Sequence, residues 1–244
     1  MCAMNIIKIK ETISTNLYLS ELSEKKIFSE WTILVAENQT AGRGQADNVW
    51  ESEAGKNITC SLLLKPTFLP VEQHFMLSKV VALGVKSALD EYVENVSVKW
   101  SNDIYVGDRK IAGILIENEL TGCEISQSIV GIGLNVNQKA FLSDASNPVS
   151  LFQLLGKETD LDILLQKIVE KIMFWYNHLK NNEIKLISET YFQNLYRREG
   201  FYNYKDKNGI FRAKIISISP EGYLCLQTET GEKRFYEQKE VAFI

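Results

Sequence analysis

Two apolar runs on either side of a long polar stretch constrain the fold most. The runs read WTILVAE (31–37) and NITCSLLLKP (57–66), and their branched and aliphatic residues predict two buried strands. In the second run, Cys60 and the alternate apolar residues face one way, while Ser61 and the alternate polar residues face the other. The sequence therefore predicts a sheet with an apolar face in the core and a polar face that can line a cavity.

The patterns up to about residue 198 predict a mixed β-sheet with packed helices, in the α+β class. Alternating segments indicate further strands, and apolar residues at helical spacing indicate helices. The expected strands are 5–14, 96–100, 103–120 with a hairpin near Gly107, and 125–137. The expected helices are a short one that starts at Ser14 or Thr15, and longer ones at 71–92, 160–179 and 184–196.

The character of the chain changes near Gly200. Short strand patterns at 210–219, 221–228, 231–236 and 239–244 are separated by glycine-bearing turns. Such a meander is typical of a small SH3-like barrel. We therefore expect two domains, 1–198 and 199–244, and since no low-complexity linker separates them, we expect them to pack closely.

Composition excludes several classes of protein. The formal net charge of −4 provides no overall basic field for DNA or anionic membranes. No apolar run reaches the roughly 18 residues of a membrane-spanning helix, and the first residues lack the layout of a signal peptide. Four scattered cysteines without a CxxC pair indicate reduced thiols and a cytoplasmic protein. Both histidines fall in helical patterns, so any active site must work without histidine.

The glycine-rich segments do not match the standard phosphate-binding loops. A P-loop requires Ser or Thr after Gly-Lys, but Gly55-Lys56 is followed by Asn57, and Trp50 stands where the first glycine is needed. The segment GRGQAD lacks the third glycine of the Rossmann fingerprint, and a strand rather than a helix follows it. Each Gly-x-Gly taken alone fits a turn as well as a ligand site.

The polar residues near the strand ends are more informative as a group. Gly42 and Gly44 flank Arg43, so the backbone can approach a ligand while a permanent cation faces it. The other members of the group are Lys99, Trp100, Asn102, Asp103, Lys110, Asn135 and Asn137. Cations and amides without a histidine or an activated serine suit the stabilisation of anions, as in phosphoryl or nucleotidyl transfer. The alternative from the residues alone is that these are solvated loop positions.

Four motifs in order resemble the signature of biotin–protein ligases. They are GRG-x(5)-W-x-S-x-x-G-x-N from Gly42, KWSND from Lys99 where the family has KWPND, K-x-x-G-I-L-x-E from Lys110, and G-x-G-x-N from Gly131. ISTN before the first helix also resembles the family's S-T-N. The resemblance runs from about residue 5 to residue 140. It implies the class II synthetase-like biotin/lipoate ligase fold with a C-terminal SH3-like barrel.

The resemblance also implies a reaction and its partners. Biotin and ATP, with Mg²⁺, would give biotinyl-5'-AMP, and a lysine of a biotin carboxyl carrier protein would then accept the biotinyl group. We expect a monofunctional ligase without a DNA-binding domain, because the first strand begins within about five residues of Met1. DNA and membranes are not expected partners, and a homodimer is left open.

Residue roles follow from the resemblance as expectations. Biotin would contact Ser14, Thr15, Asn16, Gln39, Arg43, Gly44, Gln45, Lys110 and Gly113. The nucleotide would contact Arg43, Trp50, Asn102, Asp103 and Asn135. Lys110 and Arg43 would be catalytic. We expect no certain metal ligand, since Mg²⁺ would be held mainly by the phosphates of ATP. The segment from about Thr40 to Val49 would be a lid that is mobile when empty and ordered by the adenylate.

The sequence departs from the family pattern in two places, and rival functions stay open. Gln45, Ala46 and Asp47 stand where the family often has arginine or glycine, which puts the retention of the adenylate in question. Ser101 replaces the usual proline. The nearest rival is a lipoate–protein ligase, because the catalytic fold is shared. A repressor activity and a non-catalytic biotin-binding protein are the rivals from other classes.

Overall fold

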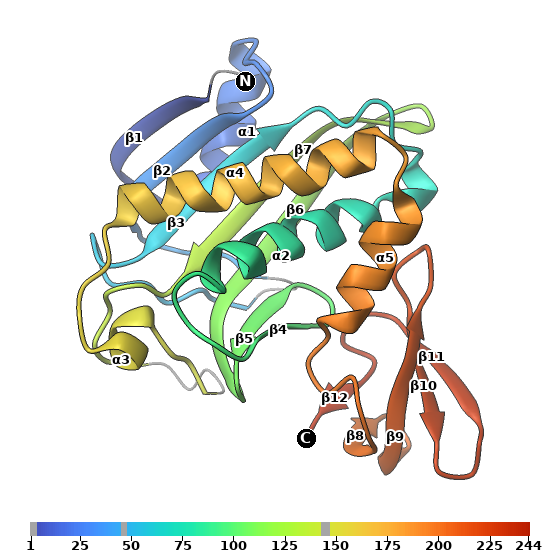
Figure 1. Cartoon of the computed structure of the whole chain (residues 1–244). Helices are drawn as coiled ribbons and strands as arrows, with labels where there is room; N and C mark the ends of the chain where they lie inside the picture. The colour runs from blue at the N-terminus through green and yellow to red at the C-terminus, as the bar shows by residue number, and fades with distance from the viewer. Residues whose placement is uncertain (1–3, 45–47, 143–146) are drawn as a thin grey trace.

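A seven-stranded mixed sheet organises the first part of the chain (Figure 1). The computed structural model describes residues 4–44, 48–142 and 147–244. The strands are β1 (Asn5–Thr12), β2 (Thr32–Gln39), β3 (Ile58–Leu64), β4 (Val96–Lys99), β5 (Asp103–Val106), β6 (Arg109–Thr121) and β7 (Glu124–Leu134). Their order is β1-β2-β3-β7-β6-β5-β4. β1 pairs with β2 in parallel, and the other neighbours pair antiparallel.

Helices cover both faces of this sheet. On one face lie α2 (Phe75–Leu89), α4 (Leu161–Lys180) and α5 (Ile184–Gln193), and Figure 1 shows α2 and α4 side by side across the sheet. A Cβ at Gly84 of α2 would lie 2.5 Å from Cγ1 of Ile172, so glycine permits this close approach. On the other face α1 (Thr15–Lys25) packs in a smaller cluster with β2, β3 and β7.

The polar face of β3 expected from the alternation is present. Cys60 and the alternate apolar residues of β3 belong to the large core under α2 and α4. Ser61 points to the α1 side, where its hydroxyl lies 2.8 Å from Thr15 Oγ1 and 2.6 Å from Asn16 Oδ1. Since Gly131 and Gly133 of β7 lie on the same side, this face of the sheet has the space to form a cavity.

The C-terminal part forms a five-stranded antiparallel sheet next to β4 and β5 (Figure 1). Its strands are β8 (Tyr202–Asp206), β9 (Gly209–Ile218), β10 (Leu224–Thr228), β11 (Lys233–Tyr236) and β12 (Ala242–Phe243), in the order β11-β10-β9-β8-β12. β11 and β12 are its two edges in the described structure, so the expected small SH3-like barrel is confirmed in an open form.

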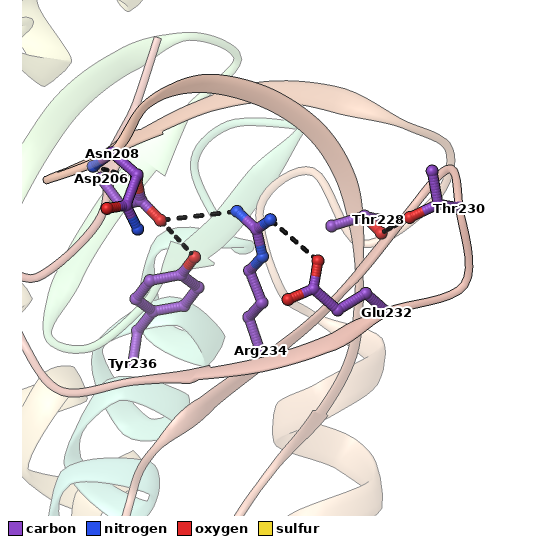
Figure 2. A network of polar contacts seen from close by, with 7 residues as sticks. All are labelled: Asp206, Asn208, Thr228, Thr230, Glu232, Arg234 and Tyr236. Carbon is purple, nitrogen blue, oxygen red and sulfur yellow. Dashed lines mark hydrogen bonds and ion pairs between the residues drawn. The ribbon is translucent and has the colours of Figure 1, made fainter.

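Polar side chains connect strands of this sheet that are not neighbours. Figure 2 shows Arg234 of β11 between Glu232 and Asp206, the last residue of β8. The hydroxyl of Tyr236 donates a 2.8 Å hydrogen bond to the same Asp206 carboxylate. The Tyr236 hydrogen bond, with further donors and Arg234, lowers the pKa of Asp206. Because β8 and β11 are separated by β9 and β10, this network indicates that the sheet curves.

The large sheet and the small one share one hydrophobic cluster. It includes Tyr204, Leu224 and Leu226 of the small sheet together with the core beneath α2 and α4. Trp100 Nε1 also donates a 2.9 Å hydrogen bond to the carbonyl oxygen of Gly222. The expected close packing is therefore present, and the boundary between residues 198 and 199 stays a prediction.

Two elements were not predicted, one predicted helix end needs correction, and the predicted hairpin is confirmed. The sequence patterns did not predict β8, whose only buried residue is Tyr204, or the short helix α3 (Leu151–Leu155). The expected strand 103–120 is the β5–β6 hairpin, with Gly107 at φ 58° in its turn. The last long helix ends at Gln193 rather than near Tyr196, because Leu195 forms an isolated bridge with Val98 of β4. In the described residues, no helix has both the length and the apolarity that crossing a membrane requires.

Candidate active site

A cavity of about 170 Å³ lies on the α1 side of the large sheet. Most residues expected at the site line it: Ser14, Thr15, Asn16, Gln39, Arg43, Gly44, Trp50, Asn102, Asp103, Lys110 and Gly113. Further lining residues that were not predicted are Asn48, Val49, Cys60, Ile114, Leu115, Gly131, Ile132, Gly133 and Lys239. Segments far apart in the sequence thus converge on one site.

The start of α1 supplies uncharged hydrogen-bonding groups. Thr15 donates to Gln39 Oε1 from its backbone nitrogen at 2.8 Å and from Oγ1 at 3.1 Å. Ser14 is the N-cap residue of α1, but its side chain makes no capping hydrogen bond. The Ser14 side chain is buried and lines the cavity, so its hydroxyl can face a ligand.

Asn16 is fixed by bonds at both ends of its amide. Its Nδ2 donates to the Leu115 carbonyl at 3.2 Å and to Glu117 Oε2 at 2.7 Å. A Cβ at Gly131 would come within 2.5 Å of its Oδ1. The amide of Asn16 therefore has one allowed position, set by β6 and β7.

Each of the two predicted catalytic cations is paired with a carboxylate. Arg43 Nη1 lies 3.3 Å from Glu117 Oε1, and these two side chains are 44% and 41% exposed. Lys110 Nζ lies 2.7 Å from Asp103 Oδ1, in a pair that is only 29% and 24% exposed. The two cations share the cavity, and an anionic ligand would find both held by carboxylates.

Trp50 lies inside the cavity against two glycines. A Cβ at Gly133 would be 2.3 Å from Cε2 of its indole, and a Cβ at Gly113 would be 3.1 Å from Cζ3. Lys110 Nζ lies 5.6 Å from the centre of the indole. The buried Nε1 of Trp50 has no hydrogen-bond partner among the residues that the structure describes. This N–H is a donor that a ligand could satisfy.

Two titratable side chains near the cavity, Lys99 and Cys60, have pKa values shifted by burial. Burial lowers the pKa of Lys99, as do the nearby cations Lys110 and Arg197, while Asp103 acts in the opposite direction. Lys99 donates a 2.9 Å hydrogen bond to the Tyr105 hydroxyl. Burial also raises the pKa of Cys60 to about 12, so this thiol stays protonated and is not a nucleophile at neutral pH.

Asn102 and Asn135 hold the backbone around the site. Asn102 Nδ2 donates to the Ile114 carbonyl, and its Oδ1 accepts from Ser101. Asn135 is buried and donates to the Val149 carbonyl at 3.2 Å, but its Oδ1 lacks a partner within the described part of the chain. Asn135 is not among the cavity-lining residues of that part, so its predicted contact with the nucleotide stays a prediction.

Part of the expected lid lies outside the described residues. Gln45, Ala46 and Asp47 lie outside the described residues, so the expected biotin contact of Gln45 stays a prediction. The flanks of the segment are paired: Arg43 bridges Val49, and Trp50 donates its backbone N–H to the Gly42 carbonyl at 2.9 Å. The ligand-dependent ordering of Thr40 to Val49 stays a prediction as well.

The profile of the biotin/lipoate A/B protein ligase family matches residues 6–135, which is more than half of the 244 residues. The chain belongs to this family. The match contains the cavity residues from Ser14 to Gly133 and ends at Asn135. The recognition drawn from the ordered motifs is therefore confirmed.

Named relatives agree with the family assignment. The chain is 33% identical over 214 residues to the bifunctional ligase/repressor BirA of Bacillus subtilis, covering 85% of this chain and 65% of that protein. It thus spans about two thirds of the length of this relative. The biotin–[acetyl-CoA-carboxylase] ligase of Paracoccus denitrificans is 31% identical over 180 residues, which are 70% of this chain and 72% of that one.

A solved structure of the family has the same fold. The biotin protein ligase from Aquifex aeolicus in complex with biotin and ATP aligns with a TM-score of 0.80 and 28% identity over 98% of each chain. The alignment includes the small C-terminal sheet as well as the large one. The expected biotin/lipoate ligase fold is thereby confirmed.

Two charged residues, Glu117 and Lys239, are among those that were missed, although the sequence carried a signal for Glu117. Glu117 is the glutamate of the K-x-x-G-I-L-x-E motif, and it contacts both Arg43 and Asn16. Lys239 comes from the loop between β11 and β12 and lines the cavity from the small sheet. No local pattern distinguishes Lys239 from other surface lysines, because only the packing of the two sheets brings it to the site.

Proposed function

We propose that this protein is an ATP-dependent biotin–protein ligase that works through biotinyl-5'-AMP. The observation that carries the proposal is the composition of the cavity. It combines the neutral hydrogen-bonding groups of Thr15, Asn16 and Gln39 with the cations Arg43 and Lys110. Biotin has a neutral polar ring system, which needs neutral hydrogen-bonding groups, and a carboxylate, which needs cations. The fold similarity to a ligase solved with biotin and ATP supports the same conclusion.

In the first step an oxygen of the biotin carboxylate attacks the α-phosphorus of ATP. The new P–O bond forms as the bond to pyrophosphate breaks, and the products are biotinyl-5'-AMP and pyrophosphate. Both reactants are anions, so without cations the site would repel them. Lys110 and Arg43 would offset the charge that gathers between carboxylate and phosphate.

In the second step the neutral amine of a carrier lysine attacks the carbonyl carbon of the mixed anhydride. The C–N bond forms, AMP leaves with the electrons of the C–O bond, and the nitrogen loses one proton. The intermediate must be kept from water until the carrier arrives. Trp50, which lies against Gly113 and Gly133, would cover it from the loop side.

Mg²⁺ would enter with the nucleotide and offset the charge of its phosphates. The Asp103 carboxylate is an oxygen ligand of the kind that Mg²⁺ prefers, and so is Asn135 Oδ1, which has no partner among the described residues. Across the described ranges 4–44, 48–142 and 147–244, no group of three His, Cys, Asp or Glu side chains could hold a metal. The Asp103 carboxylate, which lines the cavity, fits an ion shared with the nucleotide.

The acceptor in this proposal is a biotin carboxyl carrier domain of a carboxylase, as the name of the Paracoccus relative suggests for that protein. The free thiols of Cys60, Cys123 and Cys225 are in keeping with a reducing, cytoplasmic setting. The absence of DNA binding stays a prediction, and a homodimer stays open. The lipoate alternative receives less support, because the named relatives are biotin ligases.

The test is a complete reaction with a defined acceptor. The purified protein is incubated with ATP, Mg²⁺, biotin and a carrier domain, and intact mass spectrometry follows the acceptor. We expect the mass gain of one biotinyl group, with pyrophosphate released only when biotin is present. A carrier domain whose acceptor lysine is changed to arginine is the control. Preferential use of lipoate or octanoate with a lipoyl domain would contradict the proposal.

A further inference from the structure

Glu117 stands where two hollows of the surface meet. One hollow is the active-site cavity, and the other is a groove of about 300 Å³ between α1 and the strands β6 and β7. Asn16 lines both, and Glu117 lines the groove. Arg43 lines the cavity, but its guanidinium extends to Glu117 on the groove side. An anionic ligand of the cavity would therefore compete with Glu117 for this cation.

The two oxygens of Glu117 have different partners. Oε2 accepts a 2.7 Å hydrogen bond from Asn16, which is only 3% exposed. Oε1 lies 3.3 Å from Arg43 Nη1, and this pair is almost half exposed. Solvent-exposed ion pairs are weak, whereas hydrogen bonds from buried donors to a charged group are not. The bond from Asn16 to Oε2 is therefore the stronger one, and the weaker pair of Oε1 with Arg43 can exchange.

We propose that Glu117 is a positioning residue that serves as an exchangeable counter-ion for Arg43. It holds Arg43 at the cavity wall while the site is empty and releases it to the carboxylate of the entering substrate. Its second oxygen continues to hold Asn16 throughout. The inference rests on the proposed function, because it requires a substrate with a carboxylate at this end of the cavity.

We expect Glu117 to weaken the binding of ligands that carry a carboxylate, but not the binding of neutral ligands. A substrate carboxylate must compete with Glu117 for Arg43, but a neutral analogue has no such competition. In Glu117→Gln, the amide oxygen can still accept from Asn16, while the amide nitrogen cannot pair with Arg43. This variant therefore removes the ion pair with Arg43 but keeps the hydrogen bond from Asn16.

The experiment measures the dissociation constants of biotin and of its alcohol analogue, in which CH₂OH replaces the carboxylate, by calorimetry. In Glu117→Gln we expect the preference for biotin over the alcohol to increase by up to about fivefold. This corresponds to the roughly 1 kcal/mol of an exposed ion pair. The control is Glu119→Gln, two residues along the same strand, whose Oε2 accepts from Gln127. It should leave the preference unchanged.

Glu117→Ala separates positioning from a general loss of structure. It also removes one of the hydrogen-bond partners of Asn16, so both ligands should bind more weakly, but the preference for biotin should still increase. An unchanged or smaller preference in both Glu117 variants would overturn the inference while leaving the ligase proposal intact. A wild-type protein that binds neither ligand would overturn the proposed function itself, and this inference with it.

Discussion

The indole of Trp50 occupies the space that a side chain at Gly133 would need. The distance from an added Cβ to Cε2 would be 2.3 Å, and to Nε1 2.6 Å. Gly113 on the neighbouring strand β6 faces the same ring. The glycines of the two motifs on β6 and β7 therefore provide the surface on which the loop tryptophan lies. Their role follows from the absence of a side chain rather than from backbone conformation.

Gly133→Ala should displace Trp50 and weaken biotin binding by about tenfold, because overpacking of this kind typically costs 1–3 kcal/mol. Gly133 is not among the glycines with positive φ, so alanine fits the backbone itself. Calorimetry on a double-mutant cycle tests the cause. Added to Trp50→Ala, the same glycine change should cost little. Full additivity of the two changes would show that the displaced indole is not the reason.

Lys110→Ala should lower the rate of adenylate formation by about two orders of magnitude. Its ammonium lines the cavity, and the loss of one donor that meets developing negative charge typically costs about 3 kcal/mol. Lys56→Ala is the control, because Lys56 pairs with Glu158 in a pair that is largely exposed. Biotin-dependent pyrophosphate release measures both. Equal, mild losses would remove Lys110 from the mechanism.

Lys79→Met should stabilise the protein at about pH 7 and alter its pH dependence. Lys79 is 3% exposed, and its amine contacts the Ser188 hydroxyl at 3.1 Å and lies 5.7 Å from the centre of the Phe75 ring. Burial lowers its pKa from 10.5 to about 8. Between these two values the unfolded chain binds more protons than the folded one, so stability rises with pH.

Urea unfolding at several pH values measures this effect. Lys79 should contribute an increase of about 2 kcal/mol to the free energy of unfolding of the wild type from about pH 7 to about pH 9.5. That increase should disappear in Lys79→Met. Lys86→Met, in the same helix, removes a lysine that pairs with Asp90 and should keep the increase. The same pH dependence of stability in the wild type and in Lys79→Met would contradict the prediction.

Gly222→Ala should destabilise the contact between the C-terminal part and α2 by about 2 kcal/mol. Gly222 has φ 101°, and its Cβ would lie 2.6 Å from Cγ of Phe75. Gly231→Ala is the matched control, with φ 88° and no described heavy atom within 4 Å of the added Cβ. Both changes strain the backbone, but only the first meets a side chain. Similar losses on thermal unfolding would mean that backbone strain alone is responsible.

The sequence predicted what depends on local pattern. The alternation in β3 indicated the polar side of Ser61, and the ordered motifs indicated the cavity residues around Arg43 and Lys110. β8 was missed because YNYKD has one buried residue and no apolar alternation. α3 was missed because it is one turn and a half long, although its capping box of Ser150 and Gln153 was legible in the sequence.

The remaining features required the tertiary structure. Lys239 reaches the cavity only because the small sheet packs beside β4 and β5. The link from Arg43 through Glu117 to Asn16 joins three segments that no spacing rule relates. The sequence showed that the motifs contain glycines such as Gly131. It did not show that the Asn16 side chain lies in the space that a side chain at Gly131 would need.

The hydrogen bond from Trp100 to the Gly222 carbonyl restricts how proteins of this family can be recombined. Trp100 belongs to the same short segment as Asn102 and Asp103, which line the cavity. A foreign terminal domain grafted in place of residues 199–244 would need a left-handed glycine whose carbonyl meets this indole. It would also need a cation at the position of Lys239. Chimaeras that exchange only the terminal domain should therefore fail more often than those that exchange it together with the KWSND segment.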